Sequence, residues 1–359
     1  MIILHNFFPG RMHKFALKYC DILKANNIPF KIVDCHDSDF LNQVKQADLF
    51  IYFLGQSPMH LQQQKVLINI VDKILNIPCF PDWNTSWHFD DKIAEYYLLH
   101  SNDFPIAESW IFWDKEQAIN WAKKVEYPVI FKLKGGAGSL NVVKVDSQDM
   151  AFKLINKMFS SGIPSGRIPH ANLHSTYNKN YKRMLKNELK YSLYKLGIRY
   201  GQTENYERQR RYVFFQKFLP NNNYDTRVTV IGNKIFAFRR MNRPNDFRSS
   251  GGGNIDSSPE KIDLKVLSIA YQISQTLGFQ TMAYDFLKNE EGNPIINEIS
   301  CQFADWAIYD CPGYWDESLN WHEGHYWPQY IQLQYLLKNE NLVSPEFIID
   351  KDPNKLVKY

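Results

Sequence analysis

Two carboxylates near the end of the chain have the spacing of a metal site. In AYDFLKNEEGNPIINEIS, two apolar segments flank a polar turn, which predicts a β-hairpin with its tip at Glu291-Gly292. In that register Asp285 lies opposite Glu298, with Cβ atoms roughly 5 Å apart, and Ser300 shares their face. Two carboxylates that close repel each other unless one is protonated or a cation lies between them. The alternative is an exposed hairpin with ordinary acids, but the apolar surroundings favour a Mg²⁺ site, which needs one or two carboxylates and substrate phosphates.

A lysine inside an apolar strand is the second candidate. Lys132 lies in VIFKLKGGAGSLNVV, where an ammonium group is costly to bury unless it meets an anion. The glycine-rich loop after it, with Gly135, Gly136, Gly138 and Ser139, offers backbone N–H groups that can bind phosphate oxygens. The loop lacks GK[ST] and so is not a Walker A motif. Alone it predicts only a hairpin turn, but together with Lys132 it predicts a phosphate site.

A series of arginines favours an anionic ligand, because guanidinium groups bind carboxylates and phosphates in a bidentate manner. They are Arg227, Arg239, Arg240, Arg243 and Arg248. A two-residue turn predicts a hairpin in which Asp225 pairs with Arg240 and Arg227 shares their face. Arg239 lies on the opposite face, and at least one of the five is expected to be a structural ion-pair partner. The SSGGGN that follows is expected to be a loop over the reacting group.

Short apolar strands and helices alternate over the first 80 residues. The pattern predicts strands at 1–6, 29–33 and 49–54, and helices at 11–26, 38–46 and 60–75. This order predicts a small parallel sheet with helices packed on it. The loop after the first strand lacks GxGxxG, so no dinucleotide site is expected there.

A second unit begins near Trp87 and carries the glycine-rich loop. Helices are expected at 90–102 and 115–124, and strands at 127–133 and 141–145. Residues 167–211 hold eleven Lys and Arg against three Glu, with no clear strand. They are expected to belong to an insertion, helical in part over 179–196, with a solvated basic surface rather than a nucleic-acid site.

Antiparallel strands and two helices are expected in the rest of the chain. Strands are predicted at 211–219, 224–231, 234–240, 282–287 and 295–299, and helices at 261–277 and 325–338. The tail 311–329 is rich in Trp, His and Tyr, and either lines an acceptor pocket or caps the metal hairpin. His322 and His325 have no evident third ligand and are left out of the metal set. The predicted units are 1–86, 87–160, 161–210 and 211–359.

The composition is that of a folded protein without a membrane span. Of 359 residues, 44% are hydrophobic, 22% charged and 15% aromatic, which excludes a disordered chain. The net charge of +4 is too small to indicate a nucleic-acid partner by itself. The longest apolar run, 49–54, is far short of the ~20 residues that cross a membrane. The five cysteines form no CxxC pair, so a reducing, cytoplasmic location is expected.

Seven motifs in order resemble the ATP-grasp superfamily, most closely the RimK-type carboxylate–amine ligases. They are DDK (90–92), VIFKLKGGAG, FFQKFL (214–219), DTRVTVIG, NRPNDFRSSGGG, MAYDFL and INEIS, and the resemblance covers about 85–305. It implies an α/β (α+β) ATP-grasp fold. Such a fold has a small N-terminal parallel βα domain, a central subdomain with a glycine-rich flap, and a C-terminal antiparallel-sheet subdomain.

The resemblance also implies roles for the phosphate and metal residues. Lys92 and Lys132 would touch the ATP phosphates, together with the glycine-rich loop. Asp285 and Glu298 would hold Mg²⁺. Ser300 stands where the family usually has Asn, so a second Mg²⁺ ion would be held more weakly.

The adenine and the acceptor would be held by other motifs of the resemblance. The adenine hinge would consist of Gln216, Lys217, Phe218 and Leu219. The family often has Glu where Lys217 stands. Arg240 and Arg248 would lie near the transferred phosphoryl group and the acceptor carboxylate. Arg227 belongs to the same expected catalytic set, and Asp225 to the nucleotide-binding set.

The implied activity is an ATP- and Mg²⁺-dependent ligase that forms an amide or peptide bond through an acyl phosphate. One or two Mg²⁺ ions are expected, with Mn²⁺ as an alternative. The substrates would be a small carboxylate and a small amine, at least one of them anionic. Similar sequences suggest an amino acid joined to a sugar acid or amino sugar in surface-polysaccharide biosynthesis. The sequence leaves open whether the protein forms a homodimer. It also leaves open two other functions: an ATP-grasp kinase for a small anionic acceptor, and a non-catalytic polyanion-binding protein.

Overall fold

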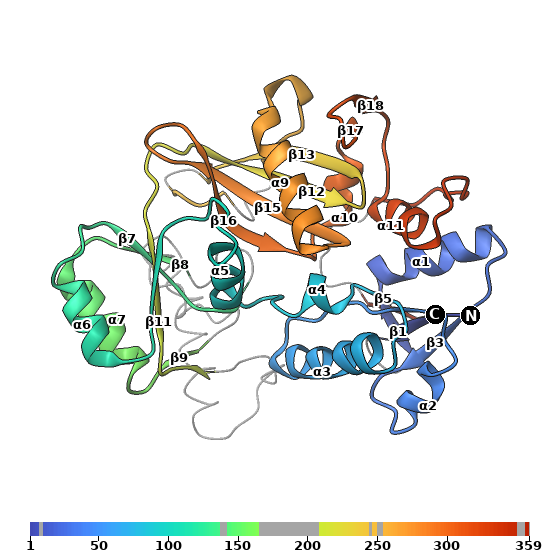
Figure 1. The fold of residues 1–359 in the computed structure, drawn as a ribbon, viewed down its shortest axis with the longest axis horizontal. Coiled ribbons are helices and arrows are strands. Elements are labelled where there is room, and N and C mark those ends of the chain that lie inside the picture. The colour runs from blue at the N-terminus through green and yellow to red at the C-terminus, as the bar shows by residue number, and fades with distance from the viewer. Residues whose placement is uncertain are drawn as a thin grey trace, which may run out of the picture.

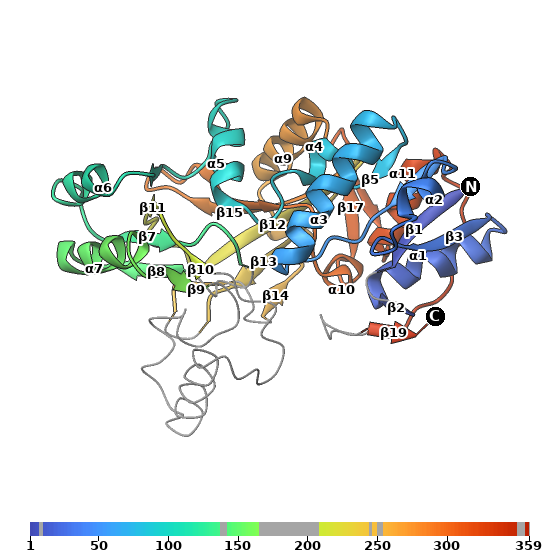
Figure 2. The ribbon, with the colours of Figure 1, turned by 90° about the horizontal axis from the view of Figure 1, so that it is seen from below.

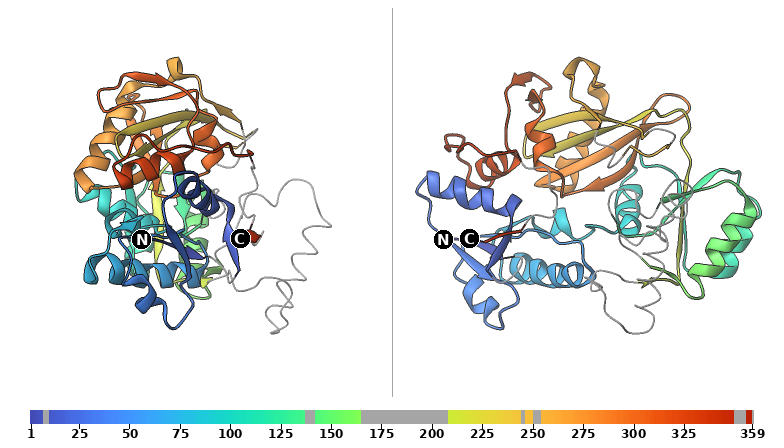
Figure 3. Two further views of the ribbon diagram at one scale, coloured as in Figure 1. Left: turned by 90° about the vertical axis from the view of Figure 1, so that its right-hand side faces the viewer. Right: turned by 180° about the vertical axis from the view of Figure 1, so that it is seen from behind.

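The computed structural model describes residues 1–6, 10–136, 142–164, 208–243, 246–249, 254–349 and 356–358. The main elements are a parallel sheet from the N-terminal part, a smaller antiparallel sheet, and a large antiparallel sheet from the C-terminal part (Figure 1). The parallel sheet and the smaller antiparallel sheet lie at opposite ends of the molecule (Figure 3). This mixture confirms the expected fold class. The unit boundaries stay a prediction, and most of the expected insertion at 161–210 lies outside the described residues.

The N-terminal sheet is parallel, as the alternation of strands and helices predicted. Its strands are β1 (Ile2–Asn6), β3 (Phe30–Asp34), β4 (Leu49–Ile51) and β5 (Cys79–Phe80), in the order β3-β1-β4-β5. Its helices are α1 (Lys14–Ala25), α2 (Phe40–Val44) and α3 (Pro58–Ile68), which continues as a π-helix over Asn69–Ile74. The sequence did not predict β5 or β2 (Arg11–His13), because two or three residues are too short to show a period. β2 pairs with β19 (Leu356–Lys358), which lies beside the C-terminus (Figure 2).

The smaller sheet carries the glycine-rich loop. Its order is β6 (Ser109–Phe112), β11 (Val213–Lys217), β7 (Val129–Lys132) and β8 (Val142–Val145), all antiparallel. Helices α6 (Lys115–Ala122) and α7 (Gln148–Met158) share a buried cluster with Val129, Phe131 and Phe215. Because strand side chains alternate, Ile130 and Lys132 point to the other face. A short pair, β9 (Ile163–Pro164) and β10 (Arg208–Gln209), joins the two sides of 165–207.

The large sheet positions the acids and arginines. Its strands are β12 (Tyr224–Ile231), β13 (Lys234–Met241), β14 (Ile255–Asp256), β15 (Thr281–Lys288), β16 (Pro294–Ser300), β17 (Gly313–Trp315) and β18 (Trp321–Glu323). They follow the order β16-β15-β12-β13-β17-β18, with β14 also on β13. Val228 and Tyr284 pack in one cluster with residues of α9 (Leu264–Leu277), which ends at Gly278 with a φ of 66°. Alternation sends Arg227 and Asp285 to the other face.

The aromatic tail forms the edge of the large sheet that is remote from the acids. β17 pairs with β13, and β18 pairs with β17, whereas β16 is the strand at the opposite edge. The prediction that the tail caps the metal hairpin is therefore wrong, because three strands separate β17 from β16. The acceptor-pocket alternative stays a prediction. Helices α10 (Asp305–Tyr309) and α11 (Pro328–Leu337) flank this tail.

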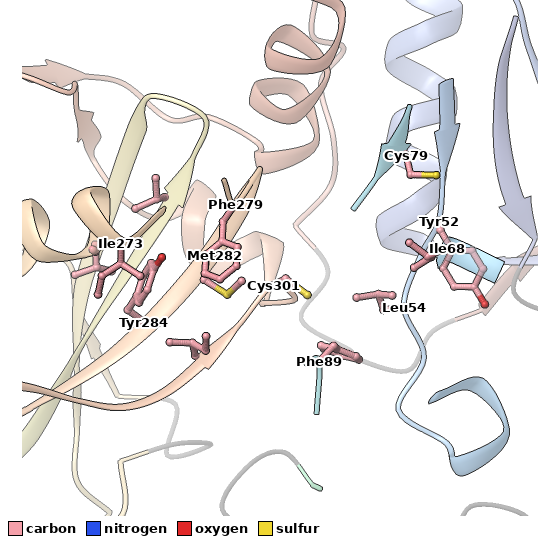
Figure 4. Close-up of a cluster of buried hydrophobic side chains, with 14 of the residues drawn as sticks. Tyr52, Leu54, Ile68, Cys79, Phe89, Ile273, Phe279, Met282, Tyr284 and Cys301 are labelled. Carbon is pink, nitrogen blue, oxygen red and sulfur yellow. The ribbon is translucent and has the colours of Figure 1, made fainter. Parts of the chain in front are cut away.

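A single buried cluster joins the N-terminal and large sheets. It contains Leu54, just beyond β4, Phe89, which precedes α5 (Lys92–His100), and Cys301, just beyond β16. Figure 4 shows these three side chains between the two sheets. The carboxyl end of β4 therefore approaches the end of the acid-bearing strand β16. Among the described residues, no helix is long and apolar enough to cross a membrane.

Candidate active site

The two predicted acids face each other across β15 and β16. Asp285 pairs with Glu298, and Ala283 pairs with Ser300, as the sequence predicted. The predicted turn tip is wrong: Lys288 pairs with Pro294, so the turn is centred on Glu291. A β-bulge next to Asp285 inserts one residue, Asn297, and restores the expected register at the acids.

Two arginines hold Asp285 as a charged carboxylate. Arg227 donates to it through Nε (2.7 Å) and Nη2 (2.8 Å), and Nη2 of Arg240 lies 2.6 Å from Oδ2. Arg240 also makes two bonds to Asp225, at 2.7 and 2.6 Å, from the strand position that the sequence predicted. Burial alone would raise the pKa of Asp285, but Arg227 and Arg240 lower it below its usual range. The two arginines and two aspartates form a network of balanced charge, in which only Arg227 is partly exposed.

The other expected arginines lie elsewhere. Arg239 pairs with Asp256 at 2.8 Å on the opposite face of β13, which confirms the expected structural role. Arg248 pairs with Asp246 at 2.6 Å, two residues earlier on its own loop. The glycines of this loop, 251–253, lie outside the described residues.

Lys92 links Glu298 to the glycine-rich loop. Its Nζ lies 3.1 Å from Oε1 of Glu298 and donates to the carbonyl of Gly136 at 2.9 Å. Lys92 is the first residue of α5, which Asp91 caps by accepting from the N–H of Ala94. Burial opposes the charge of Lys92, but the acids around it raise its pKa above the usual range. Lys92 is therefore a fixed cation beside Glu298.

Lys132 reaches the same strand from the smaller sheet. Its Nζ donates to Oδ1 of Asn297 at 3.0 Å. Burial lowers the pKa of Lys132 to about 8, and the charge of Lys92 lowers it as well, whereas Glu298 opposes the shift. Lys92 and Lys132 thus contact consecutive residues of β16, and the bulge turns both of those side chains into the site. The sequence analysis missed Asn297, since a bulge leaves no period in the sequence.

Two further acids surround Lys92 and were also missed. Asp90 has a positive φ of 55° and accepts from the N–H of Gly136 at 2.9 Å. Burial raises the pKa of Asp90 to about 6, against the opposing effect of Lys92. Glu95, one helical turn after Lys92, is buried, and burial and then Glu298 raise its pKa well above the usual range. Both could have been predicted from the sequence, because Asp90 belongs to the DDK motif and Glu95 lies three residues after Lys92.

The base of the glycine-rich loop is closely packed. A Cβ at Gly135 would come within 3.2 Å of Oδ2 of Asp90, and Gly136 has a φ of 112°. Both positions therefore favour glycine. Gly138 and Ser139, which the sequence also placed at the phosphates, lie outside the described residues.

The expected adenine hinge follows β11. Phe214 pairs with Lys132, so these two side chains share a face of the sheet, and Gln216, two residues further along β11, lies on that face as well. Gln216 is buried, and its Nε2 donates to Oγ of Ser109 at 3.3 Å. Lys217 is exposed, and its N–H donates to the carbonyl of Glu108 at 2.8 Å.

The next two hinge residues contact neighbouring loops. The Phe218 ring lies edge-on to Phe247, 5.9 Å away, with Nζ of Lys144 4.8 Å from its centre. The carbonyl of Leu219 accepts from Nδ2 of Asn222. The hinge therefore adjoins both β8 and the Arg248 loop.

The oxygen donors fit a hard cation that shares phosphate ligands. Asp285 is ionised, Glu298 is 32% exposed, and the hydroxyl of Ser300 donates to the carbonyl of Gln302 at 2.8 Å. In the described parts of the chain, no group of three or more His, Cys, Asp or Glu side chains is suited to a metal. The two carboxylates Asp285 and Glu298 fit Mg²⁺, which commonly takes one or two carboxylates and leaves the other positions to phosphates and water.

Comparisons with known proteins agree with this architecture. No family model matches the chain. A curated relative, the alpha-aminoadipate–LysW ligase LysX of Saccharolobus solfataricus, is 21% identical over 225 residues, which are 62% of this chain and 65% of the relative. The match thus spans slightly less than two thirds of that relative.

Solved structures match over more of the chain. The biotin carboxylase domain of Hydrogenobacter thermophilus 2-oxoglutarate carboxylase, solved with MgADP, matches with a TM-score of 0.56 and 13% identity over 94% of this chain and 69% of that one. The D-cycloserine synthetase DcsG matches with a TM-score of 0.53 and 12% identity over 94% and 99%. A structure of the ATP-grasp ligase PsnB with its minimal precursor, Mg and ADP matches with a TM-score of 0.51 and 11% identity over 86% of this chain and 92% of that one. This chain therefore has the ATP-grasp fold.

Proposed function

We propose that this protein is an ATP- and Mg²⁺-dependent ligase that joins a carboxylate to an amine. The observation that carries the proposal is the convergence of Lys92 and Lys132 on Glu298 and Asn297, beside the ionised Asp285. Two cations beside two carboxylates suit a triphosphate with its metal ion. The relative from Saccharolobus solfataricus is itself named a ligase, which supports the same class of reaction.

The proposed chemistry needs charge neutralisation more than a protein nucleophile. A carboxylate is a poor electrophile, and its phosphorylation creates an acyl phosphate with a good leaving group. When Mg²⁺ is bound, it supplies neutralisation of phosphate charge. Lys92 and Lys132 would bind the phosphates, and the hinge from Gln216 to Leu219 would hold the adenine. Arg240 and Arg248 would orient the anionic substrate, and exclusion of water protects the acyl phosphate.

The substrate proposal is more specific. The acyl donor is proposed to be a sugar acid or another small carboxylate, and the amine that accepts the acyl group an amino acid or amino sugar, in polysaccharide biosynthesis. The network of Arg227, Arg240 and Asp285 supports an anionic substrate, because an incoming carboxylate can replace one carboxylate partner of an arginine. A cytoplasmic location and use of Mn²⁺ belong to the same proposal.

Phosphate release tests the proposal. The wild-type protein is incubated with Mg-ATP and pools of amino acids and uronic acids, and the Glu298→Gln variant is compared with Glu291→Gln, which changes an exposed acid of the same hairpin. We expect substrate-dependent release to fall by roughly 100-fold or more in Glu298→Gln, about 2.7 kcal/mol of transition-state stabilisation, and to persist in Glu291→Gln. Equal release in all three proteins would refute the metal assignment.

Product analysis separates the ligase from the kinase alternative. A ligase yields ADP, phosphate and an amide, whereas a kinase yields ADP and a stable phosphorylated product. Mass spectrometry of the same reactions distinguishes the two.

A further inference from the structure

A second polar cluster lies at the carboxyl edge of the N-terminal parallel sheet. We name it the edge cluster, and it consists of His5, His36, Tyr52, His60 and Gln64. Four of the five side chains are at most 5% exposed, and only His36 reaches the surface. The proposed ligase chemistry uses none of them.

The topology of the sheet places this cluster where a ligand is expected. The order β3-β1-β4-β5 has a topological switch point between β1 and β4. The chain passes from β1 to β3 on one side, and the later strands β4 and β5 lie on the other side. His5 is the next-to-last residue of β1, and Tyr52 directly follows β4. The two rings are stacked, with their centres 4.2 Å apart. Open parallel sheets bind ligands outside the carboxyl ends of the strands at this switch point.

The other members come from the next loop and helix. His36 follows β3, and its ring centre lies 6.4 Å from that of His5 and 6.3 Å from that of His60. Asp34 is the acid beside the cluster, and one oxygen lies 2.8 Å from Nδ1 of His36. His60 lies in the first turn of α3, where Ser57 caps the helix and contacts Nδ1 of His60 at 2.9 Å.

Two buried donors of the cluster have no hydrogen-bond partner in the described part of the chain. They are the hydroxyl of Tyr52, which is 3% exposed, and Nε2 of Gln64, which is 2% exposed. Oε1 of Gln64 accepts from the N–H of Gly55 at 3.0 Å, so the amide is held with its NH₂ group directed away from Gly55. Buried polar groups are normally satisfied, and an exception needs an explanation such as a ligand or ordered water.

The backbone is shaped to keep this arrangement. A Cβ at Gly55 would lie 2.6 Å from Nδ1 of His60, so only glycine permits the close approach of the β4–α3 loop to that ring. Burial, then His36 and His60, lower the pKa of His5 to about 3, so its ring is neutral at physiological pH. The cluster therefore presents neutral donors.

We propose that the edge cluster binds an oxyanion, a carboxylate or a phosphate group, carried by one of the two substrates. The hydroxyl of Tyr52 and Nε2 of Gln64 supply the donors. Leu54, two residues beyond Tyr52, lies in the same buried cluster as Cys301, so this edge of the N-terminal sheet adjoins the end of the acid-bearing strand β16 (Figure 4). The identification of the ligand as a substrate rests on the proposed function, but binding of an oxyanion does not.

The test measures binding of two simple probes without ATP. Inorganic phosphate and acetate are titrated separately into the wild-type protein, Tyr52→Phe and Gln64→Glu, followed by calorimetry and by histidine imidazole NMR shifts. We expect at least one probe to bind the wild type and to bind each variant about 10-fold more weakly, because each variant removes one donor to an anion. Preference for phosphate or for acetate identifies the source of the oxyanion.

A matched control excludes a merely structural role. Tyr284 is also a buried tyrosine, but its hydroxyl already bonds to Oγ of Ser274 at 2.7 Å. Tyr284→Phe should lower the unfolding midpoint and leave probe binding unchanged, whereas Tyr52→Phe should weaken binding without lowering the midpoint. Unchanged probe binding in Tyr52→Phe, or no binding by the wild type, would overturn the inference.

The two proposals fail in different ways. If the wild type releases phosphate from ATP and Tyr52→Phe leaves the substrate KM unchanged, the ligase proposal stands and the edge cluster is not a substrate site. If oxyanion binding depends on Tyr52 but no substrate supports phosphate release, the edge cluster stands and the ligase proposal fails.

Discussion

The pKa values of two buried lysines, Lys92 and Lys132, are shifted in opposite directions. Lys92 lies beside Glu298 and near Glu95 and Asp90, and its pKa is raised. Lys132 contacts the neutral amide of Asn297, and burial lowers its pKa to about 8. The difference arises because only Lys92 has a carboxylate partner close enough to offset desolvation.

The lowered pKa predicts a pH dependence of nucleotide binding. Above pH 8 the free protein loses the Lys132 proton, so the affinity for Mg-ATP should fall by up to about tenfold per pH unit. In Lys132→Arg the guanidinium stays charged, and this decline should disappear. Calorimetric titrations between pH 7 and 10 measure both. Lys134→Arg, which alters a half-exposed neighbour, should keep the wild-type decline, and an equal decline in Lys132→Arg would contradict the assignment.

The β-bulge in β16 is the element that completes the site. Without the bulge, strand alternation would turn Asn297 to the face opposite Glu298, away from Lys132. With it, consecutive residues reach two lysines that come from α5 and β7. The bulge therefore joins the smaller and the large sheet at the point where the phosphates are proposed to bind.

Removal of the bulge side chain should affect nucleotide binding and little else. Asn297→Ala takes away the contact of Lys132, and we expect the KM for ATP to rise roughly tenfold, about 1.4 kcal/mol, with a change in unfolding free energy of about 1 kcal/mol. Asn293→Ala is the matched control, because Asn293 contacts Lys265 at 3.3 Å on the exposed turn of the same hairpin. A KM that is unchanged in Asn297→Ala would separate the bulge from the nucleotide site.

The whole molecule is held together by contacts between distant parts of the chain. One is a buried ion pair between Lys18 of α1 and Asp305 of α10, with Nζ and Oδ2 2.7 Å apart. Gln329 donates to the same carboxylate at 3.0 Å, and the Trp327 ring lies 3.1 Å from Nζ of Lys18. These contacts connect α1 to α10 and to the start of α11.

Breaking this pair from one side should be costly. Lys18→Met leaves the Asp305 carboxylate buried without its cation, and we expect a loss of about 3–5 kcal/mol in unfolding free energy, measured by urea denaturation. Lys24→Met, on the same helix, removes an exposed pair with Asp21 at 3.9 Å and should cost about 0–0.5 kcal/mol. The double change Lys18→Met with Asp305→Leu should recover part of the loss. A loss in Lys18→Met no larger than in Lys24→Met would show that the pair does not stabilise the fold.

Local chemistry made part of this structure readable from the sequence alone. Turn residues and strand alternation predicted that Asp225, Arg227 and Arg240 share one face, because pairing in a hairpin is set by residues close in sequence. The pairing of Asp285 with Glu298 was predicted from a turn placed one residue off, and the bulge in β16 compensated for that error. The order of strands and helices in the first 80 residues predicted the parallel sheet, and the ordered motifs predicted the ATP-grasp fold.

Only the tertiary structure decided which of these groups meet. The contacts of Lys132 with Asn297, of Asp90 with Gly136, and of His5 with Tyr52 join segments that are 165, 46 and 47 residues apart along the chain. No periodicity encodes such contacts, and an inserted bulge residue looks like any other strand residue. They depend on how sheets pack against one another, because burial and the charges that packing brings together set the pKa and the partner of each side chain.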